Sequence, residues 1–567
     1  MKKHNIARAA VSAGLAIAMT FGGVAPATMA FADGTDTTAA ASNITITNVP
    51  GNVTSFKGYE IFKADVVDNG NGGKTVSNIA WAGSTKEQQD AVKTAVETAI
   101  KGQDKTYAGT TAQDAADWMN NNIQGTGATA AVDSSSAANA IAKAVEKEKL
   151  TTTTTVTGGT ASGTLESGYW LFVTDPDSVD NKVDGVEGKK DTETYTAPIF
   201  TVIGGATVTV TEKSSIPTVD KWVKNDKTGS DWGKVADSEA GQELNYKLVG
   251  TVAQDVATYD TYYYKFTDTL SAGLNADANS IVVKIQNGTT ETEITSGFTK
   301  SVVSNKDATD AKDQTSTLSV EFTDLKAAAK AAGITLDANS KVNVYYNAKL
   351  DPNKAMKVAS EDNPNEVKLT YSNNPHSTSH GETVPHKVTD YTYKLNIVKE
   401  SSTEATKKLS GAKFTIKATT PDDSDSTNKY VQADGTLGAT AHEFITDENG
   451  EIAVSGLDAG TYTVSETTSP AGFNKVADFT FTITPTWDNT DATKATKLAS
   501  LAVSDNSTAV DSAVSNGQVN LTVKDTPGSG LPLTGQAGVT LTFVAGALVL
   551  AFGVSRVVRN RKEQDAE

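Results

Sequence analysis

The stretch TYTVSETTSPAGF, residues 461–473, decides how the C-terminal part of the chain folds. Tyr462, Val464 and Glu466 occupy alternate positions, and alternate side chains of a β-strand lie on one face. If that face is the core, Glu466 places a carboxyl where burying a charge costs several kcal/mol. Glu466 therefore either faces solvent at the end of a strand or has a chemical role.

The composition favours an all-β protein with several domains. The 567 residues suffice for three or four domains of about 150 residues each. Thr, Gly, Asn, Asp and Val are abundant, which is typical of short strands joined by turns. The chain has no cysteine, so neither disulfides nor thiolate metal sites are available. The net charge of −18 and the lack of a basic stripe argue against nucleic acid as a partner.

The first 32 residues are typical of a cleaved signal peptide. A basic start is followed by an apolar centre and by Ala30-Phe31-Ala32, which fits the A-x-A rule for cleavage between Ala32 and Asp33. A membrane anchor is the alternative, but Gly and Pro interrupt the apolar run.

The far end carries a pentapeptide, an apolar segment and a basic tail, in that order. Residues 537–555 have no charge and are nearly long enough to span a bilayer, and four basic residues follow. Alone, this pattern predicts a C-terminal membrane anchor. The pentapeptide resembles the L-P-x-T-G sorting signal of Gram-positive surface proteins; it consists of Leu531, Pro532, Leu533, Thr534 and Gly535. The resemblance implies that a sortase cysteine attacks the Thr534 carbonyl and passes Thr534 to an amine.

Between the ends, strand patterns predict three β-sandwich domains in a row, the first with inserted helices. Apolar spacing predicts one helix that begins at a capping box of Ser84 and Glu87 and stops at Gly102, and a second near residues 137–150. The predicted boundaries are 1–32 for the signal peptide, 33–212, 213–390 and 391–527 for the domains, and 528–567 for the sorting signal.

In the third domain, three apolar series that each follow one strand face end in an ionisable group. These series are Leu395, Ile397 and Lys399; Tyr462, Val464 and Glu466; and Val519, Leu521, Val523 and Asp525. One such residue is ordinarily a solvated strand end. Three of them, on the first, a middle and the last strand, indicate a common buried site.

The third domain resembles the B-type domains of collagen adhesins. The similarity lies in VKESSTEATKKLSGAKFTI, residues 398–416, and in YTVSETTSPAGF, which resembles the E-box of that family. The resemblance implies an Ig-like sandwich in which Lys399 forms an isopeptide bond with Asp525, promoted by Glu466. Because the acceptor is Asp rather than Asn, this bond would release water. Burial lowers the pKa of a lysine and raises that of a carboxyl, which suits the reaction.

The second domain repeats the pattern and resembles the middle domain of sortase-assembled backbone pilins. The similar stretches are PTVDKWV (217–223), YKFTDTLSAGL (264–274) and NPNEVKLTYSNNP (363–375). The resemblance implies a bond between Lys221 and Asn373, promoted by Asp268. Lys224 and Asn374 are the neighbouring candidates, and their strand parity argues against both. An ion pair at a sandwich edge is the alternative interpretation.

The first domain opens with NITITNV, which contains no lysine, so we expect no such bond there. It ends with VTVTEK, where Lys213 occupies the place of the linkage lysine of backbone pilins. Thr211 and Glu212 replace the usual Tyr-Pro, and Gly204 stands where the family has an upstream Trp. A surface lysine at a domain junction is the alternative.

These resemblances imply the backbone subunit of a covalent pilus on the cell surface, in which Thr534 of one copy is joined to Lys213 of the next. The implied partners are further copies of the chain, a sortase, accessory pilins and peptidoglycan, and the precursor would be transiently membrane-bound. The alternative is a monomeric wall-anchored adhesin whose ligand is a host matrix protein or glycan. We expect no enzyme beyond the autocatalytic bonds, no cofactor and no metal; the histidines at 376, 380 and 386 lie in a Pro- and Ser-bearing linker.

Overall fold

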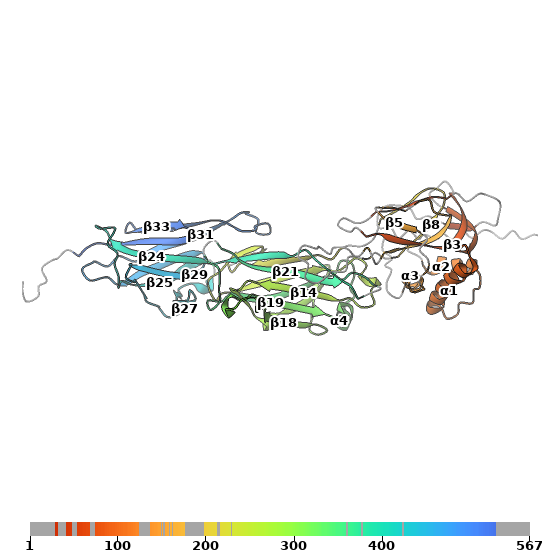
Figure 1. Cartoon of the computed structure of the whole chain (residues 1–567). Helices are drawn as coiled ribbons and strands as arrows, with labels where there is room; N and C mark the ends of the chain where they lie inside the picture. Colours follow the sequence, from red (N-terminus) through yellow and green to blue (C-terminus); the bar gives the residue numbers. More distant parts are fainter. Residues whose placement is uncertain are drawn as a thin grey trace, which may run out of the picture. The chain divides into compact units, whose positions relative to one another are not determined.

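The computed structural model (Figure 1) describes most of the chain between Met29 and Gly528. The described residues are 29–31, 41–47, 54–68, 74–123, 136–148, 150, 154–157, 159–161, 163–175, 178, 195, 198–211, 216–227, 229–358, 361–375, 378–421 and 424–528. They group into two units, Met1–Thr392 with Thr486–Ser500, and Tyr393–Pro485 with Leu501–Glu567. The architecture is mostly β, with three helices in the first predicted domain, so the predicted class is confirmed at that level.

The N-terminal part of the first unit is built on a nine-stranded sheet. The predicted strand GYWLFVT is β7, whose seven residues are all buried, as its unbroken apolar run requires. β1 pairs in parallel with β4 and would be lost if the chain is cleaved after Ala32. The strands are β1 (Met29–Phe31), β2 (Ile44–Thr47), β3 (Phe56–Asp68), β4 (Lys74–Trp81), β5 (Thr154–Thr157), β6 (Thr160–Ala161), β7 (Gly168–Thr174), β8 (Ile199–Ile203) and β9 (Val208–Thr211).

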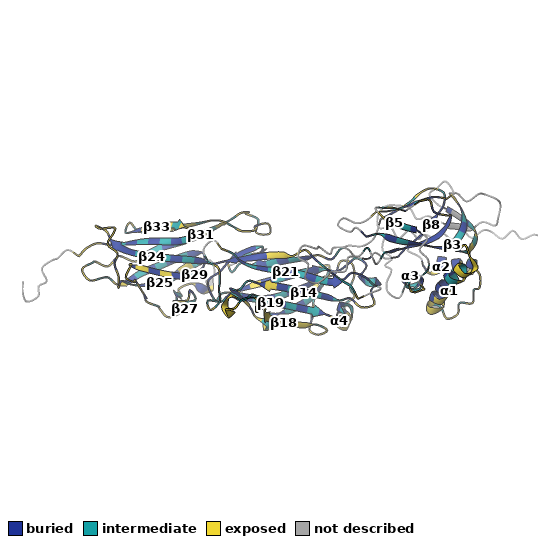
Figure 2. Cartoon of the chain, viewed as in Figure 1, coloured by how far each residue is buried: buried dark blue, intermediate teal, exposed yellow. Residues whose placement is uncertain are grey.

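Three helices cover part of this sheet: α1 (Lys86–Gln103), α2 (Ala112–Asn122) and α3 (Ala137–Lys147). Figure 2 shows α1 with buried and exposed residues on different sides, as an amphipathic helix requires. The prediction missed α2, whose apolar side consists mainly of alanine and therefore gives a weak hydrophobic signal.

The predicted start of α1 was wrong by one residue. The N-cap is Thr85, whose Oγ1 accepts from the Gln88 backbone N–H at 3.3 Å, while the Gln88 side chain accepts from the Thr85 N–H at 3.2 Å. Ser84 and Glu87 have the same spacing, so sequence alone did not separate the two capping boxes. The helix also continues past Gly102 to Gln103.

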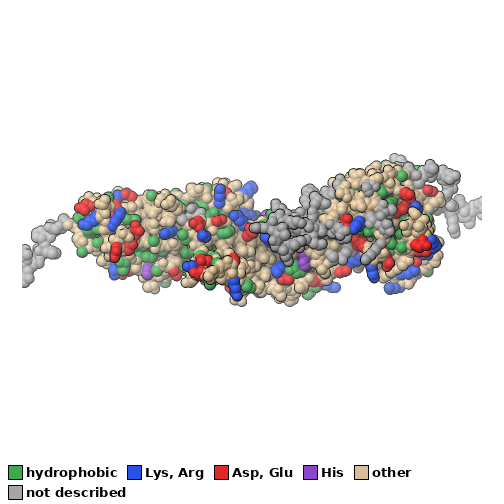
Figure 3. All heavy atoms as spheres, in the orientation of Figure 1, with side chains coloured by type: hydrophobic (Ala, Val, Ile, Leu, Met, Phe, Trp, Pro, Cys, Tyr) green, Lys and Arg blue, Asp and Glu red, His purple; other side chains and the backbone are tan. Residues whose placement is uncertain are grey.

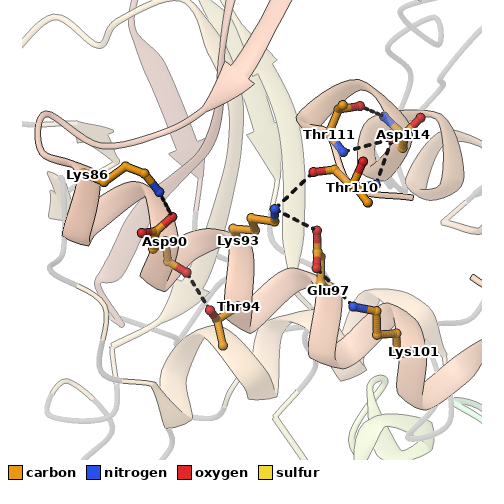
Figure 4. Close-up of polar contacts among 9 residues, drawn as sticks. All are labelled: Lys86, Asp90, Lys93, Thr94, Glu97, Lys101, Thr110, Thr111 and Asp114. Carbon is orange, nitrogen blue, oxygen red and sulfur yellow. Dashed lines mark hydrogen bonds and ion pairs between the residues drawn. The ribbon is translucent and has the colours of Figure 1, made fainter. Parts of the chain in front are cut away.

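The exposed face of α1 carries charge pairs four residues apart, which Figure 4 shows as sticks. Glu97 accepts from Lys101 at 3.1 Å and lies 3.7 Å from Lys93. Lys93 also donates to the backbone carbonyl of Thr110 at 3.1 Å, just before α2 begins. Such surface pairs contribute about 0.3–0.5 kcal/mol each, so they orient the side chains on α1 but add little to its stability.

Two seven-stranded sheets form the rest of the first unit, and residues of both share one hydrophobic core. One has the order β11-β10-β13-β20-β16-β17 with β15 beside β20, the other β12-β23-β21-β14-β19-β18 with β22 beside β21. The first comprises β10 (Val219–Lys224), β11 (Trp232–Gly233), β13 (Glu243–Thr251), β15 (Leu274–Ala276), β16 (Val282–Asn287), β17 (Thr290–Ile294) and β20 (Lys341–Leu350). The second comprises β12 (Val235–Asp237), β14 (Tyr264–Leu270), β18 (Thr299–Ser304), β19 (Ser316–Phe322), β21 (Asn363–Ser372), β22 (His380–Glu382) and β23 (His386–Tyr391). A short helix, α4 (Leu325–Ala331), was not predicted.

The second unit has a four-stranded sheet and a seven-stranded sheet. The four-stranded sheet comprises β24 (Tyr393–Ser401), β29 (Glu451–Leu457), β33 (Val510–Ser515) and β34 (Gln518–Asp525). The other comprises β25 (Lys413–Pro421), β26 (Tyr430–Val431), β27 (Leu437–Gly438), β28 (Phe444–Ile445), β30 (Gly460–Thr468), β31 (Phe479–Trp487) and β32 (Leu498–Asp505). Burial alternates along the whole of β34 and along β24 and β30 up to Lys399 and Glu466, which places their predicted apolar series inside.

The surface agrees with the mixed charge of the sequence. On the face shown in Figure 3, acidic and basic side chains are interspersed. Within the described residues, no helix has the length and apolar character needed to cross a membrane. The predicted sorting segment, residues 528–567, lies outside the described residues apart from Gly528.

The cap assignment is testable by comparing two neighbouring substitutions. We expect Thr85→Ala to destabilise α1 by about 1 kcal/mol, because it removes a side-chain acceptor for an otherwise unpaired helix N–H. Ser84→Ala is the matched control and should change little. Hydrogen exchange of the first turn of α1 measures both, and equal protection in the two variants would contradict the assignment.

Candidate functional site

The second unit brings Lys399, Glu466 and Asp525 together in its interior. β24 and β34 run parallel, with Lys399 opposite Val523 and therefore two residues from Asp525 in register. The Lys399 Nζ contacts Oδ1 of Asp525 and lies 3.3 Å from Oε1 of Glu466. None of the three is more than 1% exposed. Glu466 therefore does not face solvent, and the three apolar series meet at one point.

Burial shifts the pKa values of the two carboxyl groups in this cluster. Loss of water raises the pKa of Glu466 and of Asp525 above their ordinary values, since a low-dielectric interior disfavours the charged form. Glu466 is held by the backbone N–H of Val476, which donates to Oε2 at 2.7 Å. The Phe414 ring lies 5.3 Å from the Lys399 Nζ. The Lys399 amine thus faces two carboxyl groups whose pKa values are raised, and it also faces the ring of Phe414.

A second buried cluster joins the two sheets of the middle sandwich. Lys221, on β10, contacts Oδ1 of Asp268, on β14 of the opposite sheet. The Tyr346 hydroxyl accepts from the Lys221 Nζ at 3.1 Å and donates to Oδ2 of Asp268 at 2.6 Å. Lys221 and Asp268 are fully buried. The pair therefore lies in the core and not at a solvated edge of the sandwich.

The electrostatics of this cluster shift the Lys221 amine toward its neutral form. Burial lowers the pKa of Lys221 to about 8, although the adjacent Asp268 carboxyl opposes that shift. Burial also raises the pKa of Asp268. Both shifts favour transfer of a proton from the ammonium to the carboxylate, which leaves a nucleophilic amine.

The amide at this cluster belongs to Asn365 and not to the predicted Asn373. The Asn365 Nδ2 donates to the Tyr346 hydroxyl at 2.7 Å. In the β14–β21 register, Asp268 lies opposite Val367, so Asn373 is displaced by six residues, or about 20 Å along the strand. Its Oδ1 accepts instead from the Ser379 hydroxyl at 2.7 Å.

This correction has a simple cause. Asn365 and Asn373 share the parity of Val367, so alternation places both on the inner face and does not say which end of β21 meets Lys221. The stretch VNVYYNAKL also places Tyr346 on the inner face of β20, a signal that the sequence analysis did not use. Lys224, at the opposite parity to Lys221, is only partly buried, as predicted from its parity.

Several predicted sites lie outside the described residues. These are the linkage lysine Lys213, the cleavage pair Ala32 and Asp33, and the sorting motif with Thr534. In the described part of the first domain, Lys74 on β4 is a buried lysine that donates to the backbone carbonyls of Gly204 and Ala206, the latter at 3.2 Å.

Comparisons with known proteins bear on the fold. Residues 394–497 match the family model described as the SpaA prealbumin-like fold domain, a segment that contains Lys399 and Glu466 and ends before Asp525. A search of curated proteins gives no match. The chain is similar to the T6 backbone pilin of serotype M6 Streptococcus pyogenes, with 16% identity over 87% of this chain and 100% of that chain and a TM-score of 0.47. It is also similar to the major pilin SpaD of Corynebacterium diphtheriae, with 16% identity over 86% and 98% of the two chains and a TM-score of 0.42.

Two asparagine substitutions distinguish the observed site from the predicted one. If Lys221 reacts with the amide that faces it, Asn365→Ala should retain the mass of one ammonia that the wild-type chain loses. Asn373→Ala should lose that ammonia as the wild type does, because its amide lies at the other end of β21. Intact-mass spectrometry of the mature chain makes the measurement; the opposite pattern would restore Asn373 as the acceptor.

Proposed function

We propose that this chain is the backbone subunit of a covalently polymerised pilus on a Gram-positive cell surface. Each copy contributes tandem Ig-like sandwiches, stabilised by internal isopeptide bonds, to a head-to-tail polymer. The role is structural, and the only chemistry of the chain itself is the formation of those bonds.

One observation carries the proposal: an inward-facing lysine meets a carboxyl partner in the core of each of two sandwiches. A buried ion pair is a costly way to stabilise a core, because apolar residues of the same volume serve as well or better. A covalent amide removes both charges, so the arrangement is better explained by bond formation than by ion pairing. A covalent cross-link inside a domain is useful to a protein that must resist pulling. The LPLTG sorting motif predicts attachment to a cell surface, where such pulling occurs.

The bond in the third domain would join Lys399 to Asp525. The amine attacks the Asp525 carboxyl carbon, a C–N bond forms, and one carboxyl oxygen leaves as water after protonation. Burial raises the pKa of Glu466 and so favours its protonated form, which would donate to the developing oxyanion. Glu466 would then take a proton from the attacking nitrogen and pass one to the carboxyl oxygen that departs as water. Packing of β24 against β34 supplies the proximity of the reacting groups.

Assembly would use the two ends that sequence alone identifies. A signal peptide cleaved between Ala32 and Asp33 directs export, and the apolar segment after Gly535 holds the precursor in the membrane. A sortase then joins Thr534 to Lys213 of the next copy, or to peptidoglycan for the basal copy. Accessory pilins would share the same linkage.

The second candidate is a monomeric wall-anchored adhesin that uses its sandwiches as a stalk. The sorting motif and the buried clusters agree with both candidates. Lys213 distinguishes them, since only a polymer needs an acceptor lysine on the chain.

Polymer formation gives the first test. In a Gram-positive host with the cognate sortase, immunoblots of wall extracts should show a ladder of high mass that collapses to one band in Lys213→Ala. Lys105→Ala, which removes an exposed lysine from the first predicted domain, is the matched control and should keep the ladder. A single anchored band in all three chains would favour the adhesin.

The internal bond gives the second test. Glu466→Gln should retain the water that the wild type loses from the third domain, because an amide side chain does not relay the proton. Loss of the cross-link between residues 399 and 525 should lower the free energy of unfolding by about 5 kcal/mol, by analogy with a disulfide that closes a loop of similar length. Intact mass and thermal unfolding measure the two effects. Glu448→Gln, at an exposed position, should change neither, and a dehydrated Glu466→Gln chain would refute the role of Glu466.

A further inference from the structure

Tyr346 is the centre of the cluster in the middle sandwich. Its hydroxyl accepts from the Lys221 Nζ at 3.1 Å and from the Asn365 Nδ2 at 2.7 Å, and it donates to Oδ2 of Asp268 at 2.6 Å. A hydroxyl has one donor and two acceptor positions, so these three contacts use its full capacity. The attacking nitrogen, the departing nitrogen and the carboxyl group of Asp268 therefore all hydrogen-bond to the same hydroxyl oxygen.

The ring of Tyr346 is fixed in this position. It stacks on the Tyr246 ring with 5.2 Å between centroids and an interplanar angle of 9°, and the two residues are register partners on β20 and β13. Tyr346 is 1% exposed, which leaves little room for another rotamer. The Tyr246 hydroxyl, in contrast, has no hydrogen-bond partner within the described part of the chain. Two stacked tyrosines thus differ in whether the hydroxyl reaches the reacting groups.

We propose that Tyr346 is a catalytic residue of the Lys221–Asn365 reaction, which transfers a proton from the attacking nitrogen to the departing nitrogen. This inference rests on the proposed function, since it concerns the bond that the pilin would form in its middle domain. It goes beyond the roles assigned to Lys221, Asp268 and an asparagine, because it adds a fourth group that contacts both nitrogen atoms.

The proton transfers balance as follows. Asp268 takes one proton from the Lys221 ammonium through its contact with Nζ, which leaves a neutral amine. The amine attacks Cγ of Asn365, and the new C–N bond forms as the carbonyl becomes tetrahedral. The Tyr346 hydroxyl then gives its proton to Nδ2 and takes one from Nζ. The Cγ–Nδ2 bond breaks, ammonia leaves, and the secondary amide and the tyrosine hydroxyl remain.

The geometry explains why a relay is needed at this site. Ammonia leaves only after Nδ2 gains a proton, because an amide anion is a very poor leaving group. Asp268 contacts Nζ and the tyrosine hydroxyl, whereas Nδ2 donates to that hydroxyl. Tyr346 thus bridges the atom that loses a proton and the atom that gains one.

The experiment compares Tyr346→Phe with Tyr246→Phe in the full mature chain. After a pulse of cell-free synthesis, mass spectrometry of proteolytic digests follows the Lys221–Asn365 cross-linked peptide over time. We expect Tyr346→Phe to slow its formation about 100-fold, the usual contribution of a positioned acid–base group. Tyr246→Phe keeps the stack and should react at the wild-type rate. Formation of the Lys399–Asp525 cross-link in the same molecules is the internal control, and it should proceed unchanged.

A second measurement separates proton transfer from packing. 3-Fluorotyrosine at position 346 keeps the ring and the hydroxyl but makes the hydroxyl a stronger acid. If Tyr346 relays the proton, the rate of cross-linking changes and the alkaline limb of its pH profile moves to lower pH. If Tyr346 only packs, the profile is that of the wild type.

The outcomes distinguish this proposal from the one on which it rests. A wild-type rate in Tyr346→Phe, or an unchanged pH profile with fluorotyrosine, would overturn the role of Tyr346 and leave the bond itself intact. Absence of the Lys221–Asn365 peptide from the wild-type chain would instead refute the proposed bond.

Discussion

A lysine ammonium placed between two packed sheets must be neutralised, and both clusters are arranged around that constraint. Without water, the charged form of a buried amine or carboxyl is disfavoured relative to its neutral form. Burial lowers the pKa of Lys221 to about 8 and raises that of Asp268. The same cause raises the pKa of Glu466 and Asp525 in the other sandwich. Desolvation, which is unfavourable for a stable ion pair, would favour the proposed reaction between these groups.

The two clusters meet this constraint with different chemistry. In the third domain Glu466, the proposed promoting acid, lies beside the amine and is held by one backbone N–H. In the middle domain Asp268 shares the amine with a tyrosine hydroxyl that also contacts the acceptor amide. An aspartic acceptor loses water and an asparagine acceptor loses ammonia, and the second leaving group has the greater need of a proton. The additional hydroxyl therefore occurs where the leaving group requires it.

Sequence analysis predicted which faces of the strands are buried but did not fix their register. Parity was enough for Lys399, Glu466 and Asp525, because each is the last member of its apolar series and the series converge. It failed for Asn373, because β21 carries asparagines at both ends with one parity, and only pairing with β14 shows which end meets Lys221. The one-residue error at Ser84 has the same origin, since two overlapping capping boxes satisfy one pattern. α2 and α4 were missed because alanine gives helices little hydrophobic contrast, and tertiary packing supplies the rest of their stability.

If Asn365 is the acceptor, its position changes how a stretched middle domain would carry force. A bond from Lys221 to Asn365 links the first strand of one sheet to the start of β21 in the other, so tension entering at β10 bypasses the chain between them. Residues 366–391 follow that bond along the chain and would carry the load in series with it. Their strands are held by the pairing of β21 with β14 and β23 and of β23 with β12. In the third domain Asp525 is the last residue of β34, so no part of that strand follows the bond along the chain. The third domain would therefore be nearly inextensible once cross-linked, whereas the middle domain keeps a hydrogen-bonded segment in series with its covalent link. That segment, rather than either core, is where such a fibre would first yield.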